Sequence, residues 1–172
     1  MVQGRTGGMV MREQFQHLLE NHRGIVLKVA HTYCSHAEDR RDLAQEIAAQ
    51  AWKGFRGYDP VRPFSTWLYR IALNVAISHL RASGGRAPLT FDEIAEPAHD
   101  EDMPREADDG MRALYRCIER LDPLNRALML LYLDERNQRE IAEILGLSET
   151  NVATKIARLK QRIRNDLNPA GT

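Results

Sequence analysis

An acidic segment rich in proline divides this 172-residue chain into two pieces. Nine acidic residues and a single base lie between Pro88 and Gly110, so the segment carries a net charge of −8 and the rest of the neutral chain carries +8. Its three prolines and the preceding Ser-Gly-Gly argue against a long helix there. Segments of this composition form solvated tethers between folded units. The sequence therefore predicts a flexible leader at residues 1–10, two folded domains at 11–84 and 112–168, and an acidic linker at 85–111.

The N-terminal piece has the apolar periodicity of helices and no alternating pattern of strands. The first apolar run is interrupted at His22-Arg-Gly, where a break or kink is expected. A second helix is predicted from Asp39 to about Phe55. A third is predicted to start near Ser65, which would act as its N-cap. The buried face of this third helix is expected to consist of Trp67, Leu68, Ile71, Ala72 and Val75.

The C-terminal piece contains four predicted helices with matching cap residues. Asp122 followed by Pro123 marks a helix start, because Asp accepts a free N–H and Pro lacks one. Gly146 suits the left-handed residue that ends a helix, and Ser148 suits the N-cap of the next one. The helices are predicted at residues 111–120, from 123, at 138–145 and at 149–166. Their apolar faces are expected to include Leu114, Tyr115, Ile118 and Leu121, then Leu124, Ala127, Leu128, Leu131 and Tyr132. Both pieces are therefore predicted to be all-α.

The last two predicted helices have the spacing of a helix-turn-helix. Ala142 is small where the second helix crosses, Gly146 permits the tight turn, and the apolar positions between Ile141 and Ile156 lock the two helices together. In such units the start of the second helix meets base edges in the DNA major groove. The candidate base-reading residues are Glu149, Thr150, Asn151, Ala153, Thr154 and Lys155. Basic residues suited to DNA phosphates are Lys155, Arg158, Lys160, Arg162 and Arg164.

Composition and motifs exclude several other classes of protein. Apolar residues make up 43% of the chain, but no window of 18 consecutive apolar residues exists, so no membrane insertion is expected. Two cysteines and no signal-peptide core favour a reduced, cytoplasmic setting. His31, Cys34 and His36 are too few for a structural zinc site, so no metal is expected. No phosphate loop, nucleophile elbow or zinc-hydrolase motif is present, so neither enzyme activity nor a cofactor is predicted.

The whole pattern resembles the sigma factors of bacterial RNA polymerase, in the compact extracytoplasmic-function (ECF) class of the sigma-70 family. Residues similar to sigma region 2 are Asp42-Leu-Ala-Gln-Glu46, Ala51-Trp52, Phe64-Ser-Thr-Trp-Leu-Tyr-Arg-Ile-Ala-Leu-Asn74 and Leu80-Arg81. Residues similar to region 4 are Leu121-Asp-Pro-Leu-Asn-Arg126, Leu130-Leu-Tyr-Leu133, Glu140-Ile-Ala-Glu-Ile-Leu-Gly-Leu-Ser148 and Val152 to Arg158. The match spans residues 11–167. It implies a bundle of three or four helices for region 2 and a helix-turn-helix for region 4.

The resemblance implies a sigma factor that binds core RNA polymerase, through its β and β′ subunits, and directs it to promoter DNA. It would promote DNA melting and be regulated by an anti-sigma factor. The acidic linker would run toward the RNA exit path, where carboxylates stand in for RNA phosphates. The contact with the β′ clamp helices would fall on Asp42, Gln45, Glu46 and Gln50. Trp52 is a further candidate that burial in the core would explain equally well.

The same resemblance assigns the two DNA-binding surfaces. Region 4 would read the −35 element, with base contacts from Glu149 to Lys155 and phosphate contacts from Arg158 onward. In region 2 the −10 element would be contacted by Arg70, Asn74, Ser78 and Arg81. Aromatic residues that could stack on an unpaired base are Tyr58, Phe64 and Tyr69. The chain departs from the family at three positions: Ser78 replaces the usual acid, Leu73 a common Arg, and Lys155 a frequent Arg.

One alternative function stays open, that of a stand-alone helix-turn-helix transcriptional regulator. Such a protein would share the C-terminal pattern, usually bind DNA as a dimer, and carry a ligand-binding or phosphoacceptor domain. The N-terminal piece has no βα pattern of that kind. A decoy with the same fold would keep the protein contacts and lose the DNA contacts. The basic last helix argues against this possibility.

Overall fold

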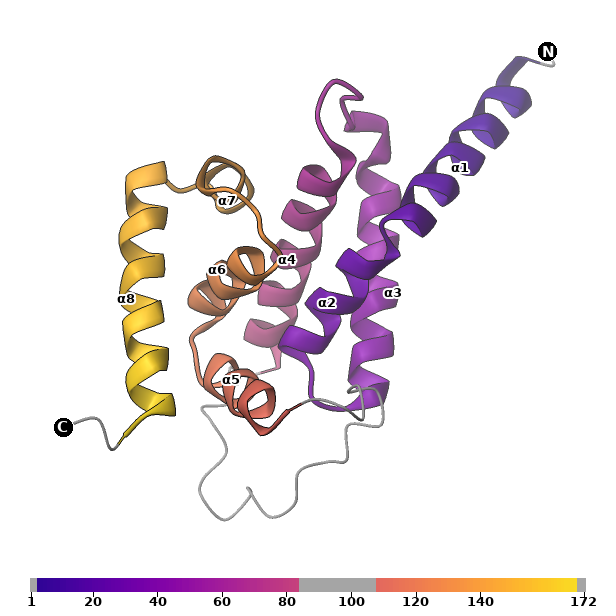
Figure 1. Cartoon of the computed structure of the whole chain (residues 1–172). Helices are drawn as coiled ribbons and strands as arrows, with labels where there is room; N and C mark the ends of the chain where they lie inside the picture. Colours follow the sequence, from indigo (N-terminus) through magenta and orange to yellow (C-terminus); the bar gives the residue numbers. More distant parts are fainter. Residues whose placement is uncertain (1–2, 84–107, 170–172) are drawn as a thin grey trace. The chain divides into compact units, whose positions relative to one another are not determined.

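The computed structural model describes residues 3–83 and 108–169, and every regular element in these two ranges is helical (Figure 1). The chain divides into two compact units, Met1–Ala76 and Ile77–Thr172. The all-α prediction is confirmed for the described residues. Most of the predicted linker lies outside them, but its last three residues, from Asp109, already belong to a helix. An acidic residue in the first turn favours this earlier start, because it faces the positive end of the helix dipole.

The N-terminal module is the helical part of residues 3–82. It consists of α1 (Gln3–Asn21), α2 (Arg23–Tyr33), α3 (Ala37–Gly54), the short 3-10 helix η1 (Phe55–Gly57) and α4 (Phe64–Ala82). The predicted interruption at His22 is confirmed: its ring Nδ1 donates to the Leu18 carbonyl oxygen at 2.8 Å between α1 and α2. The largest fully buried side chains of the module are Val29, Leu43, Ile47, Leu68, Tyr69 and Leu73. These apolar contacts between helices are the main source of its stability.

Two N-terminal boundaries differ from the sequence-based expectation. Residues 3–10, predicted as a flexible leader, form the first turns of α1, where Met9 and Val10 stay exposed. The prediction that Ser65 caps α4 is wrong, because the helix already begins at Phe64 and the Trp67 N–H donates to the Pro63 carbonyl oxygen. Proline is compatible with a helix start, and the buried Phe64 anchors that start in the core.

The buried face of α4 is rotated relative to the predicted one. Leu68 and Ala72 are buried as expected, whereas Trp67, Ile71 and Val75 are only half-buried. The inward positions are completed by residues that the prediction left out: Phe64, Thr66, Tyr69, Leu73 and Ala76. The Leu73 side chain belongs to this core, so this position offers no group to DNA.

The C-terminal module spans residues 109–167 and follows the predicted cap chemistry closely. It consists of α5 (Asp109–Glu119), α6 (Pro123–Leu133), α7 (Gln138–Leu145) and α8 (Glu149–Leu167). The side chains of Asp122 and Asn137 each accept the backbone N–H three residues later. Gly146 has φ +67° and ends α7 in the left-handed conformation. Local chemistry therefore fixes where these helices begin and end.

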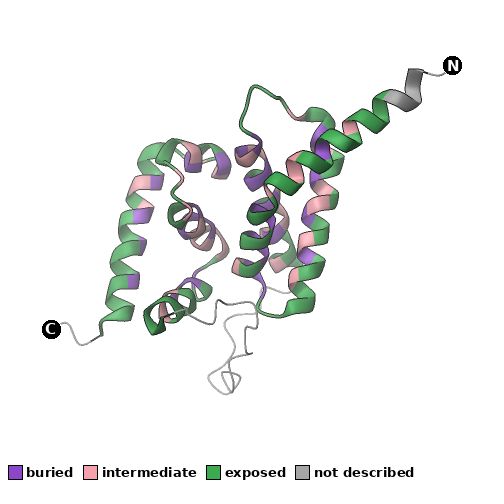
Figure 2. Cartoon of the chain, turned by 45° about the vertical axis from the view of Figure 1, so that its right-hand side comes forward, coloured by how far each residue is buried: buried purple, intermediate pink, exposed green. Residues whose placement is uncertain are grey.

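The core of the C-terminal module is apolar, and two tyrosines expected within it are exposed. Tyr115 is 48% exposed and Tyr132 is 37% exposed, while Cys117 and Met129 take inward positions. Along α8 the buried positions lie on one side of the helix and the exposed ones on the other (Figure 2). The largest fully buried side chains of the module are Leu128, Leu131, Ile141 and Val152. A one-sided apolar stripe of this kind leaves the outer side of α8 available for contacts.

Candidate nucleic-acid interface

Helices α7 and α8 form the helix-turn-helix that the spacing predicts. The Leu147 N–H donates to the Ala142 carbonyl oxygen at 3.0 Å and closes the turn around Gly146. Ile141 and Val152 are fully buried where the two helices pack, and Ala142 is 8% exposed. Ser148 Oγ accepts the Asn151 N–H at 3.1 Å and caps the start of α8. These contacts hold the first turn of α8 in one orientation.

The first turns of α8 present their side chains to solvent. Glu149, Thr150, Asn151, Thr154 and Arg158 are exposed, and Ala153 and Lys155 are half-buried. Thr154 Oγ1 donates to the Thr150 carbonyl oxygen at 3.0 Å, which fixes its rotamer. No residue of the predicted base-reading set is buried in its own module. The structure therefore brings this set together on one accessible end of the helix.

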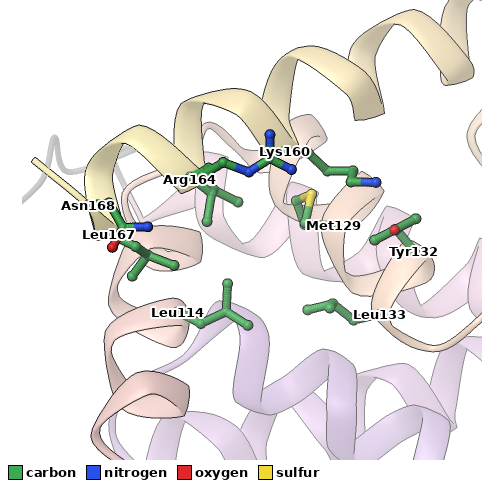
Figure 3. A pocket seen from close by; sticks show the side chains of 9 residues that line it. Leu114, Met129, Tyr132, Leu133, Lys160, Arg164, Leu167 and Asn168 are labelled. Atoms are coloured by element: carbon green, nitrogen blue, oxygen red, sulfur yellow. The ribbon is translucent and has the colours of Figure 1, made fainter. Parts of the chain in front are cut away.

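The basic residues of α8 fall on two different flanks, a division that the sequence prediction missed. At 100° per residue, Lys155, Arg158 and Arg162 share the flank of Asn151. Lys160 and Arg164 lie on the opposite flank, where both line a pocket (Figure 3). The Lys160 Nζ atom sits 5.2 Å from the centre of the Tyr132 ring. By the same geometry Glu149 and Ala153 lie on the flank of Lys160 and Arg164, so the base-reading set extends to both flanks. That all five cations suit phosphates stays a prediction.

This pocket is an apolar hollow among α5, α6 and α8, with a volume of about 290 Å³. Its apolar walls come from Leu114, Met129, Tyr132, Leu133, Ile163 and Leu167 (Figure 3). Leu133 is 46% exposed and Leu167 is 38% exposed, so the hollow opens to solvent. An apolar hollow with cations on one side fits a partner that presents apolar side chains flanked by acids. The sequence held one clue to it, the apolar residues that end α6 and α8.

The predicted polymerase-binding residues lie on the outer side of α3. Asp42, Gln45 and Glu46 are exposed, and Gln50 is half-buried and donates its Nε2–H to Glu46 Oε1 at 2.8 Å. Trp52 is 41% exposed, and its ring lies 5.2 Å from that of Phe15 in α1. Neither interpretation of Trp52 is complete, because one part of the ring packs and another part faces solvent.

Helix α4 carries the residues predicted to contact the −10 element. Arg70, Asn74, Ser78 and Arg81 are all exposed, at intervals of four, four and three residues. This spacing places them along one side of the helix. They combine two cations with an amide and a hydroxyl, a mixture that can contact both phosphates and base edges.

Two of the three aromatic residues considered for base stacking are unavailable. Phe64 is 5% exposed and Tyr69 is fully buried, so neither can stack on a base without unfolding the core. Tyr58 is half-buried; its ring stacks on Phe55, and its hydroxyl donates to the Arg62 carbonyl oxygen at 2.8 Å. Burial, and secondarily the charge of Asp59, raises the pKa of the Tyr58 hydroxyl. The phenol therefore stays protonated and keeps its hydrogen bond at neutral pH.

Other expectations concern metals and membranes. Cys34 and Cys117 are both buried free thiols. In the two described ranges, no three His, Cys, Asp or Glu side chains come close enough to share a metal ion. Within the same ranges, none of the helices has the length and apolar character needed to span a membrane.

A helix-turn-helix whose second helix faces solvent, joined in one chain to a second all-α module, is typical of DNA-binding transcription factors. Family models named Sigma-70 region 2 and Sigma-70, region 4 match residues 18–86 and 111–163. The RNA polymerase sigma-H factor of Pseudomonas aeruginosa is 30% identical over 94% of this chain and 97% of that protein. The ECF RNA polymerase sigma factor SigW of Bacillus subtilis (strain 168) is 25% identical over 91% of this chain and 90% of its own length.

A solved structure shows the same fold. It is the co-crystal structure of the sigma factor RpoE in complex with the anti-sigma factor NepR from Bartonella quintana. It matches with a TM-score of 0.66 and 15% identity, covering 94% of this chain and 98% of the other. The chain belongs to the sigma-70 family of RNA polymerase sigma factors, in its ECF class.

Proposed function

We propose that this sigma factor directs core RNA polymerase to promoters through three surfaces on three different helices. The first turns of α8 read the −35 element, the exposed side of α4 contacts the −10 element, and the outer side of α3 binds the β′ clamp helices. The observation that carries the proposal is the orientation of α8. Its buried stripe, which includes Val152 and Ile156, holds it against its own module, while Thr150 and Asn151 stay exposed. A recognition helix needs this arrangement to enter the major groove.

The exposed side of α4 is suited to a single strand of DNA. Arg70 and Arg81 supply cations for the phosphates, and the Asn74 amide can both donate to and accept from a base edge. Melting a duplex removes stacking energy, and contacts made only with the separated strand offset that loss. The side chains of α4 therefore bind the non-template strand once it is free.

The outer side of α3 supports a protein contact better than a DNA contact. Asp42 and Glu46 would repel phosphates, whereas carboxylates pair well with basic side chains of a protein partner. The partly exposed ring of Trp52, on the same helix, adds apolar area. These groups together suit docking on the polymerase.

The pocket of the C-terminal module supports binding of a second protein segment. An amphipathic helix that carries apolar residues and acids would fill the hollow and pair with Lys160 and Arg164. The related structure of RpoE with an anti-sigma factor supports control of this chain by an anti-sigma factor. The polymerase β subunit and an anti-sigma factor then bind the C-terminal module through its exposed protein-binding surfaces.

RNA synthesis itself is the chemistry of the polymerase, so this chain needs no catalytic residue or cofactor of its own. It acts in the cytoplasm, where the polymerase meets DNA. The test is reconstitution of the purified chain with core polymerase on genomic DNA, followed by sequencing of RNA 5′ ends. The proposal expects a discrete set of start sites that core polymerase alone does not give. Tight DNA binding as a dimer, with no association with core polymerase, would instead establish a stand-alone helix-turn-helix regulator.

A further inference from the structure

The pocket of the C-terminal module has apolar walls and two cations at its edge. Its volume of about 290 Å³ is roughly twice that of a cavity that holds a benzene ring. None of the nine described residues that line it is acidic. Lys160 lies over the Tyr132 ring, and Arg164 donates to Gln161 Oε1 at 3.2 Å, so the described partners of both cations are neutral (Figure 3). The pocket therefore suits an aromatic side chain that is flanked by carboxylates.

A short segment of the same chain has this chemistry. Residues 89–96, which lie outside the described ranges, read Leu-Thr-Phe-Asp-Glu-Ile-Ala-Glu and contain three acids and no base. Phe91 is the single aromatic residue between Gly84 and Ala107. Ile94 follows it by three residues, a spacing at which two side chains share one side of a helical turn. The segment thus offers apolar side chains flanked by acids, as the pocket requires.

The chain is long enough for this segment to reach the pocket. Leu114, a wall of the pocket, lies five residues after the start of α5 at Asp109, or about 8 Å along the helix axis. Asp108 comes 14 residues after Ile94. A tether of that length spans about 20 Å on average and about 45 Å when fully extended. The distance that the tether has to cover is therefore well within its range.

The tether also decides which occupant is favoured. A short tether gives the attached segment an effective concentration in the millimolar range. An interaction with a dissociation constant near 1 mM, too weak to hold a separate peptide, then fills about half of the pockets. A second copy of the chain carries the same segment, but at micromolar protein concentration it competes poorly with the tethered one. The chain's own segment is therefore the favoured occupant.

We propose that residues 89–96 occupy the pocket in the free chain, with Phe91 and Ile94 in the hollow and the acids beside Lys160 and Arg164. This inference rests on the proposed function, which assigns protein partners to the C-terminal module. A partner segment that uses the pocket has to displace the chain's own segment. Its apparent affinity falls in proportion to the fraction of pockets that are vacant. The charged linker thereby limits access to the module until a stronger partner arrives.

Methionine methyl groups report on the pocket in the full chain. Met129 lines the hollow and is 3% exposed, whereas Met9 lies in the N-terminal module and is 66% exposed. The six methionines of the chain are labelled with 13C at the methyl group and observed by NMR. The Met129 signal reports the presence of an aromatic ring in the hollow, and the Met9 signal serves as an internal reference.

Two matched variants change the linker of the full chain. Phe91→Ser combined with Ile94→Ser removes the bulky apolar side chains of the segment and is called the emptied variant. Ala87→Ser combined with Ala98→Ser makes two apolar-to-serine changes on either side of the segment and is the control. A synthetic peptide of residues 87–99, added to each protein, tests whether the pocket is vacant.

Self-occupation predicts that the Met129 signal shifts in the emptied variant, because the Phe91 ring leaves the hollow. The signal stays in place in the control, and the Met9 signal is unchanged in both. Peptide at about 1 mM moves the Met129 signal of the emptied variant back toward its original position and has little effect on the unaltered chain. Arg164→Gln in the emptied variant weakens this peptide binding about two- to fivefold, the effect of losing one exposed ion pair.

Three results would overturn the inference. The first is a Met129 signal that is the same in the emptied variant and the unaltered chain. The second is a Met129 signal that depends on protein concentration, because a second copy would then be the occupant. The third is equally strong peptide binding by the unaltered chain and the emptied variant. None of these measurements involves polymerase, so their failure is distinct from a failure of the start-site experiment that tests the proposed function.

Discussion

The side-chain hydroxyl of Ser148 accepts the backbone N–H of Asn151 at 3.1 Å, and this bond fixes the first turn of the helix that is proposed to read DNA. Asn151 is one of the exposed residues of that turn. Because the bond satisfies an otherwise free N–H at the start of α8, stability and the proposed DNA recognition share one contact.

Replacing Ser148 by Ala removes this cap. The expected loss is about 1 kcal/mol in the free energy of unfolding of the C-terminal module. For a unit of this size that corresponds to a fall of roughly 4–8 °C in melting temperature. Circular dichroism during thermal unfolding measures it, and Ser148→Asn, which keeps a capping oxygen, serves as the control. Equal losses in the two variants would show that the cap is not responsible.

The backbone angles at two turns predict that gaining a glycine at one turn stabilises the module and that losing a glycine at the other destabilises it. Glu135 follows α6 with φ +57°, a conformation that costs a residue with a side chain about 1 kcal/mol. Glu135→Gly is therefore expected to stabilise the module by up to about this amount, whereas Glu135→Ala keeps the strain. Gly146→Ala, at φ +67°, is expected to destabilise it by a similar amount, although the added Cβ meets no atom within 4 Å. Denaturant unfolding of the three variants checks the signs.

Helix ends in the C-terminal module could be predicted from sequence because they are decided locally. Asp122 and Ser148 act within three residues of their own positions, and Gly146 needs only its own backbone angles. The start of α4 was missed for a non-local reason. Ser65 looks like a cap, but burial of Phe64 in the core of the folded module draws the helix start forward.

The division of α8 into two basic flanks could not be predicted from the sequence alone. The sequence shows that Arg158 and Lys160 are both basic, and only the positions of α5 and α6 decide which of them borders the pocket. The same holds for Tyr132, whose ring faces Lys160 rather than the core. The exposure of Asn74 on α4 followed from periodicity, whereas the burial of Tyr69 depended on which neighbouring helices cover it.

Substitutions on the two flanks of α8 are expected to change the salt dependence of DNA affinity differently. Arg158→Ala is expected to weaken binding to promoter DNA and to lower the slope of log affinity against log salt by about 1, because one phosphate contact is lost. Arg164→Ala, a change of the same charge on the pocket flank, is the matched control and should leave the slope unchanged. Fluorescence anisotropy with a −35 duplex across a range of salt concentrations measures both. Identical slopes for the two variants would remove the distinction between the flanks.

The Asn74 amide is predicted to act only after the polymerase has bound. Asn74→Ala should leave affinity for core polymerase unchanged and reduce the extent of open complex, because the amide contacts a separated strand. Asp42→Ala on α3 should do the reverse and weaken association with core polymerase. Permanganate reactivity at the bubble and a core-binding titration, run on both variants, separate the two effects. Normal bubble reactivity in Asn74→Ala would contradict its role.

The phenol of Tyr58 predicts a dependence of stability on high pH. The folded state raises the pKa of this group above its ordinary value of 10.0, so the protonated form is the one that folding favours. The contribution of the group is therefore fully present below pH 10 and is lost as the pH rises through the folded-state pKa. Tyr58→Phe removes the hydrogen bond to the Arg62 carbonyl oxygen and is expected to cost about 1 kcal/mol near neutral pH. Because the variant has no phenol to ionise, it should also lose less stability than the unaltered chain as the pH rises. Urea unfolding at pH 7, 9 and 10.5 gives the free energy of unfolding of the unaltered chain and of Tyr58→Phe. If the two free energies change in parallel with pH, the phenol of Tyr58 is not responsible.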